Sequence, residues 1–115
     1  MTTAAILYFN GAIAEDKTDC AVHYTRTACL GQEAVSYKKC DGEQSCTKYK
    51  PADSLAACQD AALNSCKNKR LDITKSKVIT ATYKGKPIQS ASGKDDFCLD
   101  YPNKDTEFNQ CPEDK

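Results

Sequence analysis

Alternating apolar and polar side chains predict short β-strands along much of the chain. The strongest alternation lies at residues 78–83, where every second side chain would share one face of a strand. Further strands are predicted from shorter runs of β-branched, aromatic and apolar residues, at 20–27, 34–37, 87–89 and 97–101. An Asn-Gly pair also predicts a β-hairpin within residues 4–14, because this dipeptide accepts the positive φ angles of a two-residue turn.

A helical repeat in the middle of the chain predicts one helix, from Asp53 or Ser54 to about Asn68. Either of the first two residues can cap free backbone N–H groups, and lysines follow the end of the segment, where the helix dipole is negative. Four side chains recur at steps of three and four and would share one face: Leu55, Cys58, Ala62 and Cys66. We expect this helix to lie close on a sheet and to be tied to it at two points.

Strands before and after one main helix predict an α+β fold, in which an antiparallel sheet carries the helix on one face. The length of 115 residues fits a single domain covering residues 1–115. With no Trp and three Phe, its apolar core is modest, so covalent cross-links would contribute much of the stability. Residues 84–86, 90–96 and 40–46 have the composition of turns and loops.

Eight cysteines predict a disulfide-rich protein that belongs outside the reducing cytosol. They are Cys20, Cys29, Cys40, Cys46, Cys58, Cys66, Cys98 and Cys111. No C-x-x-C pair occurs and there is one His, so a zinc site is not expected. Spacing does not decide among the 105 pairings that eight cysteines allow. The short segment between Cys40 and Cys46 is predicted to be a bridged surface loop.

Charge is balanced overall but unevenly distributed. The formal net charge is zero, which argues against a general nucleic-acid binder. Residues 67–86 are rich in lysine and could bind anionic lipid, glycan or nucleic acid, but we interpret them as an exposed helix end and the solvent face of a strand. The acidic residues from Asp95 onward predict a solvated tail pinned by Cys111, with pairing to the basic face, within or between molecules, as the alternative. No apolar stretch is long enough to predict a membrane span.

Candidate catalytic chemistry is sparse in this sequence. His23, Arg26 and Glu33 could form a ribonuclease-like set, with Glu as base, His as acid and Arg on a phosphate. A His beside an aromatic residue in a strand is more often structural. We therefore predict no catalytic residue, no metal and no cofactor, and we do not expect an enzyme.

The small size, the eight cysteines, the bridged Ala-rich helix between strands and the lysine-rich surface resemble the secreted effectors of plant-pathogenic fungi. Among these the chain is most similar to the LARS effectors, avirulence proteins of Leptosphaeria and Cladosporium with a disulfide-rich α/β fold. The resemblance covers residues 20–111 and lies in architecture and cysteine content. It implies secretion during infection, action in the apoplast or after entry into host cells, and perception by resistance proteins. It also implies that some members can suppress recognition of another effector.

On this interpretation the protein is a secreted, monomeric virulence or avirulence effector that binds a host plant protein. It is not expected to bind nucleic acid or to span a membrane. Its recognition determinants are expected on exposed loops, within residues 41–50 and at the turn 84–86. The charged candidates in these loops are Asp41, Glu43, Lys48, Lys50, Lys84 and Lys86.

Two other classes of function stay open. A secreted inhibitor or ligand-binding module would present a rigid loop between bridges, with residues 40–46 as the candidate. A small toxin or ribonuclease-like protein would depend on the basic residues or on His23, so that replacing His23 with Ala would abolish its activity.

Overall fold

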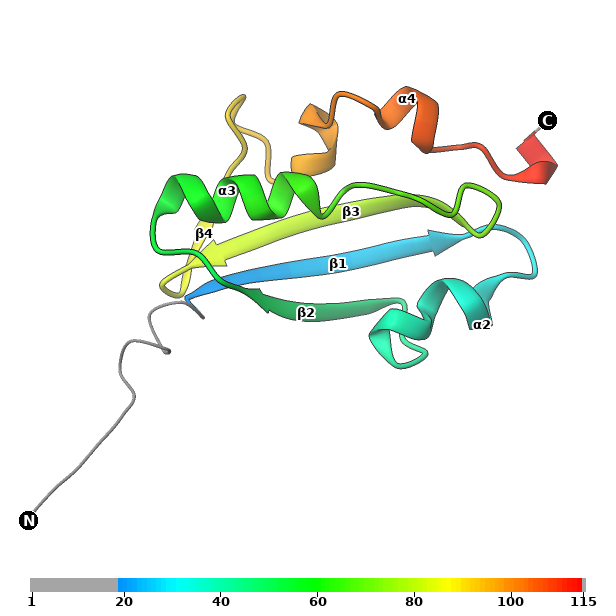
Figure 1. Ribbon diagram of the computed structural model, residues 1–115, viewed down its shortest axis with the longest axis horizontal. Helices are drawn as coiled ribbons and strands as arrows, with labels where there is room; N and C mark the ends of the chain where they lie inside the picture. Colours follow the sequence, from blue (N-terminus) through cyan, green and yellow to red (C-terminus); the bar gives the residue numbers. More distant parts are fainter. Residues whose placement is uncertain (1–18, 115) are drawn as a thin grey trace, which may run out of the picture.

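The computed structural model describes residues 19–114, which form one antiparallel sheet and a set of helices (Figure 1). The sheet has the order β2-β1-β3-β4 and contains β1 (Cys20–Ala28), β2 (Ser45–Lys50), β3 (Thr74–Tyr83) and β4 (Lys86–Ile88). The helical elements are α2 (Glu33–Ser36), η2 (Tyr37–Cys40), α3 (Leu55–Asn64), η3 (Phe97–Asp100), α4 (Lys104–Glu107) and η4 (Pro112–Asp114). The predicted disulfide-rich α+β class is confirmed.

The central strand β1 sets the two faces of the sheet. Cys20, Val22 and Tyr24 point to the face that carries α3 and are almost fully buried. Alternate residues such as His23 and Thr25 point to the other face, where they stay partly exposed. β1 pairs with β2 on one side and with β3 on the other, so its main-chain hydrogen bonds fix both neighbours.

The predicted strands at 20–27, 78–83 and 87–89 are confirmed, and β3 begins earlier than its alternation indicates, at Thr74. Ile79 and Ala81 are buried on the α3 side, whereas Val78 is exposed on the other side. The turn into β4 is also confirmed. Lys84 and Gly85 both have positive φ angles, 52° and 80°, which is the backbone of a tight two-residue hairpin turn.

Helix α3 is confirmed with Ser54 as its cap, and Ser54 Oγ accepts a hydrogen bond from the Ala57 N–H at 3.1 Å. It ends at Asn64, earlier than predicted, because the chain then makes short turns that carry Cys66 inward. Cys58 and Ala62 are buried as expected, but Leu55 is 48% exposed, so its predicted place on the packed face is wrong. Leu55 is the first residue of the helix, directly after the cap.

Two predicted strands are wrong. Residues 34–37 form α2 and the start of η2, where Ser36 is buried through a 2.7 Å hydrogen bond to the Thr74 hydroxyl and Val35 is exposed. Residues 97–100 form η3, because the Asp96 carboxylate accepts hydrogen bonds from the Cys98 and Ile79 N–H groups and caps a helical turn. In both segments a run of four or five residues was too short for alternation to identify a strand.

A strand that the sequence did not indicate is β2. Residues 41–50 were predicted to be a loop, but Ser45–Lys50 pairs with β1 in register Cys20↔Lys50 to Thr25↔Ser45. The run is polar on both faces, which hides it from hydrophobic patterning. The hairpin predicted at 4–14 lies outside the described residues.

All eight cysteines are paired, as Cys20–Cys58, Cys29–Cys111, Cys40–Cys46 and Cys66–Cys98. The first bridge ties β1 to α3. The last bridge ties the chain after α3 to η3, so only one of the two predicted ties from this helix reaches the sheet. The bridge over residues 40–46 is confirmed, although Cys46 belongs to β2 and not to a loop.

The acidic C-terminal segment is not the solvated tail that its composition predicts. Figure 1 shows it running along the molecule beside α3 and β3. The rings of Tyr101 and Phe108 are buried and stack with centroids 6.1 Å apart. Glu107 accepts a hydrogen bond from the Asn68 N–H at 2.7 Å and another from the Tyr101 hydroxyl at 2.9 Å. Among residues 19–114, no helix has the length and apolar character needed to cross a membrane.

Candidate functional site: a basic groove beside α3

A groove of about 830 Å³ lies on the helical face of the sheet, between α3 and the segments that α3 does not cover. Tyr24 and Arg26 of β1 and Lys77 of β3 line it from the sheet. Its remaining lining comes from β2, from α2 and η2, and from the end of α3 and the chain that follows. Figure 1 shows these elements around one region of the molecule, with α2 near the start of β2.

The groove exists because α3 covers only part of the sheet. The helix packs on β3 and β1, and its bridge from Cys58 to Cys20 fixes it there. Strand β2 is the outer neighbour of β1, so its α3-side residues are left open. These are Lys48 and Lys50, which the register places opposite the buried Val22 and Cys20.

The lining of the groove is strongly basic. Nine of its residues are cations, namely Arg26, Lys38, Lys39, Lys48, Lys50, Lys67, Lys69, Arg70 and Lys77. None of the described residues that line it is Asp, Glu or His. A concave surface with charges of one sign concentrates field lines and raises the local concentration of counter-ions. The arrangement is therefore suited to bind anions.

Arg26 lies at the floor of the groove and is only 6% exposed. Its Nη1 donates a hydrogen bond to Cys40 Sγ at 3.1 Å, and its guanidinium carbon lies 5.0 Å from the centroid of the Tyr24 ring. Burial lowers the pKa of Arg26 from its ordinary value of 12.5, since removal of water disfavours the charged form. A disulfide sulfur is a weak acceptor, so these contacts do not neutralise the charge.

Lys77 lies next to Arg26, because the two residues pair across β3 and β1 and point to the same face. Its Nζ donates to the Ser65 carbonyl at 3.4 Å and also to the Lys67 carbonyl. Burial, followed by repulsion from Arg26, Lys39 and Lys50, lowers the pKa of Lys77 to about 8, against a smaller opposing effect of Glu107. The groove thus holds a cation that is electrostatically unfavourable without an anion.

The residues predicted for recognition do not form one surface. Lys48 and Lys50 line the groove. Asp41 and Glu43 are exposed in the turn that precedes β2, near the end of β1. The other two are exposed near the beginning of β1, with Lys84 in the β3–β4 turn and Lys86 at the start of β4. Asp41 and Glu43 therefore lie at the opposite end of the sheet from Lys84 and Lys86, whereas Lys50 pairs with Cys20 at the same end as that turn.

The structure does not bring together the ribonuclease-like set of His23, Arg26 and Glu33. His23 points to the face of β1 opposite Arg26, and its Nδ1 lies 2.8 Å from the Thr47 hydroxyl. Glu33 is exposed in α2 and does not line the groove. A strand places residues three positions apart on opposite faces, so His23 and Arg26 do not act on one ligand from β1.

The sequence indicates many of the groove cations but not their convergence. The lysine-rich stretch 67–86 supplies Lys67, Lys69, Arg70 and Lys77, which are predicted there to be an exposed helix end and strand face. Arg26 is predicted only as a phosphate contact in a set with His23 and Glu33, and the signal for its burial is that it occupies the same strand phase as the apolar Val22. A charged residue at a buried strand position is unusual unless it has a partner.

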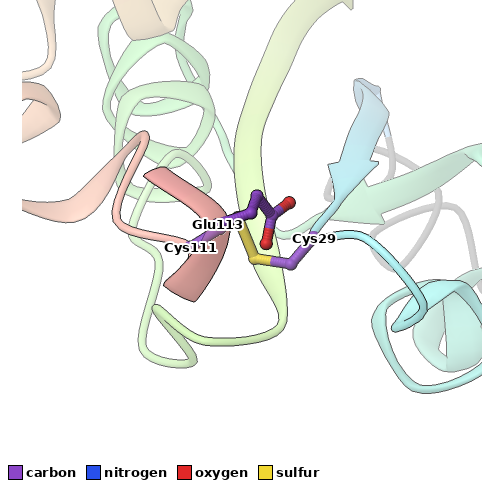
Figure 2. A group of neighbouring side chains, drawn as sticks. All are labelled: Cys29, Cys111 and Glu113. Carbon is purple, nitrogen blue, oxygen red and sulfur yellow. A yellow bond between two sulfur atoms is a disulfide. The ribbon is translucent and has the colours of Figure 1, made fainter. Parts of the chain in front are cut away.

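A group of potential metal-ligating residues lies where the C-terminal segment meets the end of β1. It consists of Cys29, Cys111 and Glu113 (Figure 2). The two sulfur atoms form a disulfide, so neither is present as a thiolate. A Glu113 carboxylate oxygen accepts a hydrogen bond from the Leu30 N–H at 2.8 Å. The disulfide and the hydrogen bond therefore join the C-terminal segment to the residues that follow β1.

No protein-family model, curated protein or solved structure matches this chain.

Proposed function

We propose that the protein is a secreted effector that acts in a plant host by binding, with the basic groove as its site for an anionic partner. The observation that carries this proposal is the convergence of nine cations, with no carboxylate among the described lining residues, on one groove. Four disulfides support an oxidising environment outside the cytosol. The setting in a plant host rests on the resemblance to fungal effectors.

Binding explains the groove better than acid–base catalysis does. General acid–base chemistry needs a proton donor and acceptor within reach of one substrate, and the described lining residues include no His, Asp or Glu. Lys77 is the lining lysine with the strongly lowered pKa, and its amine is held by the carbonyls of Ser65 and Lys67. We therefore propose a role without turnover.

Perception by a resistance protein and suppression of another effector's recognition remain part of this proposal. Both need a stable surface and no reaction, and the disulfide framework supplies such a surface. Among the proposed determinants, Lys48 and Lys50 line the groove, whereas Lys84 and Lys86 lie outside it.

The test is expression in a panel of plant genotypes, with and without a secretion signal, scored for localised cell death. We expect genotype-dependent death from the wild type and its loss in Lys48→Glu/Lys50→Glu. The matched control is Lys94→Glu/Lys104→Glu, which changes charge equally and lies outside the groove lining. Death that is lost equally in groove and control variants, or never depends on genotype, would contradict the proposal.

A second candidate for binding is the opposite face of the sheet, which suits a host protein. On this face, the β1 residues from Ala21 to Thr27 and their partners in β2 and β3 include no Asp, Glu, Lys or Arg. Tyr49 is 66% exposed there and Val78 is 46% exposed. Protein interfaces are enriched in Tyr and depleted of charge at their centre. If this face binds the host protein, Tyr49→Asp should abolish co-purification while the Lys48→Glu/Lys50→Glu variant retains it.

A further inference from the structure

We propose that the groove binds a compact polyphosphate, a small molecule or lipid headgroup that carries several clustered phosphate groups. Arg26 and Lys77 would contact it at the floor, and lysines of β2 and of the segment after α3 would contact it from the walls. This inference rests on the proposed function, since it requires the groove to be an anion site, and it adds the chemical class of the ligand.

The first argument is the condition of Arg26. A guanidinium that is 94% removed from solvent normally has a carboxylate or phosphate partner, because burying a charge without one is costly. Arg26 is 6% exposed, and no described carboxylate lines its groove. The planar guanidinium has five N–H donors, and Cys40 Sγ accepts one of them. A phosphate supplies the bidentate acceptor that matches the remaining donors.

The second argument is the clustering of like charges around Lys77. Arg26, Lys39 and Lys50 all repel its ammonium group, while Glu107 is the carboxylate that attracts it. Glu107 is already engaged by Asn68 and Tyr101 through hydrogen bonds. A multivalent anion in the groove would replace several repulsive pairs by attractive ones at once, which a single monovalent ion does not do.

The size of the groove favours a compact ligand. Its volume of about 830 Å³ falls in the range of small-molecule sites, roughly 300–1,000 Å³. Nine cations around this volume match a ligand with high charge density. An extended polyanion would neutralise as many charges only by following a longer surface track.

The chemistry of the floor disfavours nucleic acid. The Tyr24 ring is the aromatic side chain in the described lining, and it is 6% exposed. Arg26 lies 5.0 Å and the Lys50 ammonium 5.6 Å from its centroid, so cations occupy the surroundings of the ring. Single-stranded nucleic acids gain much of their affinity from bases stacked on exposed aromatic rings. The groove offers contacts to phosphate without a platform for bases.

Isothermal titration calorimetry of the oxidised protein tests the proposal with inositol hexakisphosphate, pyrophosphate and inorganic phosphate. We expect hexakisphosphate to bind at least about a hundredfold more tightly than inorganic phosphate, because two additional charge-assisted contacts suffice for that ratio. Lys48→Gln/Lys50→Gln should weaken hexakisphosphate binding by about tenfold or more. Lys94→Gln/Lys104→Gln is the matched control and should retain wild-type affinity.

The role of the floor needs variants that preserve the fold. Lys77→Gln and Arg26→Lys should each weaken hexakisphosphate binding by about tenfold or more, since each removes a charge or a bidentate contact at the floor. Circular dichroism and thermal unfolding establish that each variant is folded. If Arg26→Lys does not fold, Lys77→Gln alone tests whether the floor contacts the ligand. Wild-type affinity of Lys77→Gln for hexakisphosphate would show that the floor does not contact it.

The source of the phosphates is determined with vesicles. Binding to vesicles that contain phosphatidylinositol bisphosphate, and not to vesicles with equal charge from phosphatidylserine, would assign a lipid headgroup. Binding to hexakisphosphate without vesicle binding would assign a soluble ligand, and both results support the proposal. Binding of heparin or a single-stranded oligonucleotide through the same lysines, more tightly than hexakisphosphate, would overturn the proposal of a compact polyphosphate ligand. It would leave the proposal that the groove is an anion site intact. If none of these anions binds, both the inference and the groove's proposed function are wrong.

Discussion

At the scale of single residues, Arg26 and Lys77 are two cations whose pKa is lowered chiefly by burial. They face each other across β1 and β3, on the side of the sheet that alternation assigns to the core. A strand position is fixed by its phase, so neither side chain can leave this face without unpairing the sheet. The burial of both charges is therefore set by the backbone.

Lys77 gives a pH dependence of stability whose sign follows from its pKa. Folding lowers the pKa of Lys77 from 10.5 to about 8, so between these values the unfolded chain holds a proton that the folded protein has released. The contribution of Lys77 to stability should rise with pH across this window and stay constant below it. The free energy of unfolding of the wild type minus that of Lys77→Met, measured in urea from pH 7 to 10.5, should increase.

The difference between the two proteins is the quantity to follow, because other lysines and tyrosines titrate in the same range. Lys94→Met provides the control, since Lys94 lies in the loop before η3 and outside the groove. Parallel stability curves for the wild type and Lys77→Met would contradict the assigned environment of Lys77.

At the scale of elements, α3 shows how a short helix is placed by its ends and its bridge. Ser54 caps its first turn, and the Cys58–Cys20 bridge fixes its position on β1. The helix has ten residues, a length at which an isolated helix is marginal in water. Its stability therefore depends on the cap and on packing, and the groove beside it depends on both.

Ser54→Ala should lower the free energy of unfolding by about 1 kcal/mol, because the Ala57 N–H loses its acceptor. Ser54→Asp should retain most of the stability, since a carboxylate accepts the same hydrogen bond and suits the positive end of the helix dipole. Asp53→Ala is the neighbouring control and should change the stability little. Chemical unfolding followed by circular dichroism measures all three variants. If Asp53→Ala lowers the free energy of unfolding as much as Ser54→Ala does, the assignment of Ser54 as the cap is wrong.

At the scale of the whole molecule, the disulfides connect segments that are far apart in the chain. Cys29 and Cys111 are separated by 82 positions, and their bridge joins the end of β1 to the C-terminal segment. Cys40 and Cys46 are separated by six and close one local turn. In the chain-entropy account a bridge restricts the unfolded chain more when it closes a longer loop.

Removing the Cys29–Cys111 bridge should therefore lower the free energy of unfolding more than removing the Cys40–Cys46 bridge. We expect Cys29→Ala/Cys111→Ala to lower the free energy of unfolding by about 4 kcal/mol and Cys40→Ala/Cys46→Ala by about 2 kcal/mol, from loop closure alone. Urea unfolding of the two double variants compares them directly. A larger loss from the short bridge would show that its contact with Arg26, and not loop entropy, dominates its contribution.

Much of the fold could be predicted from the sequence because its signals are local. Alternation in residues 20–27 and 78–83 identified two strands, and small residues with a polar cap identified α3. Segments of four or five residues were misassigned, because Ser36 is buried through the Thr74 hydroxyl and Asp96 bonds to the Ile79 N–H. Both partners are distant in sequence, so no local pattern contains them.

Periodicity and cysteine content are properties of the chain, so the α+β class, the disulfide-rich character and the main helix follow from them. The disulfide pairing and the groove depend instead on contacts between distant segments. The cations of the groove come from β1, β2, β3, the α2–η2 segment and the chain after α3, and the sheet order with the Cys20–Cys58 bridge brings them together. A net charge of zero concealed this cluster, because composition sums charges and folding separates them in space.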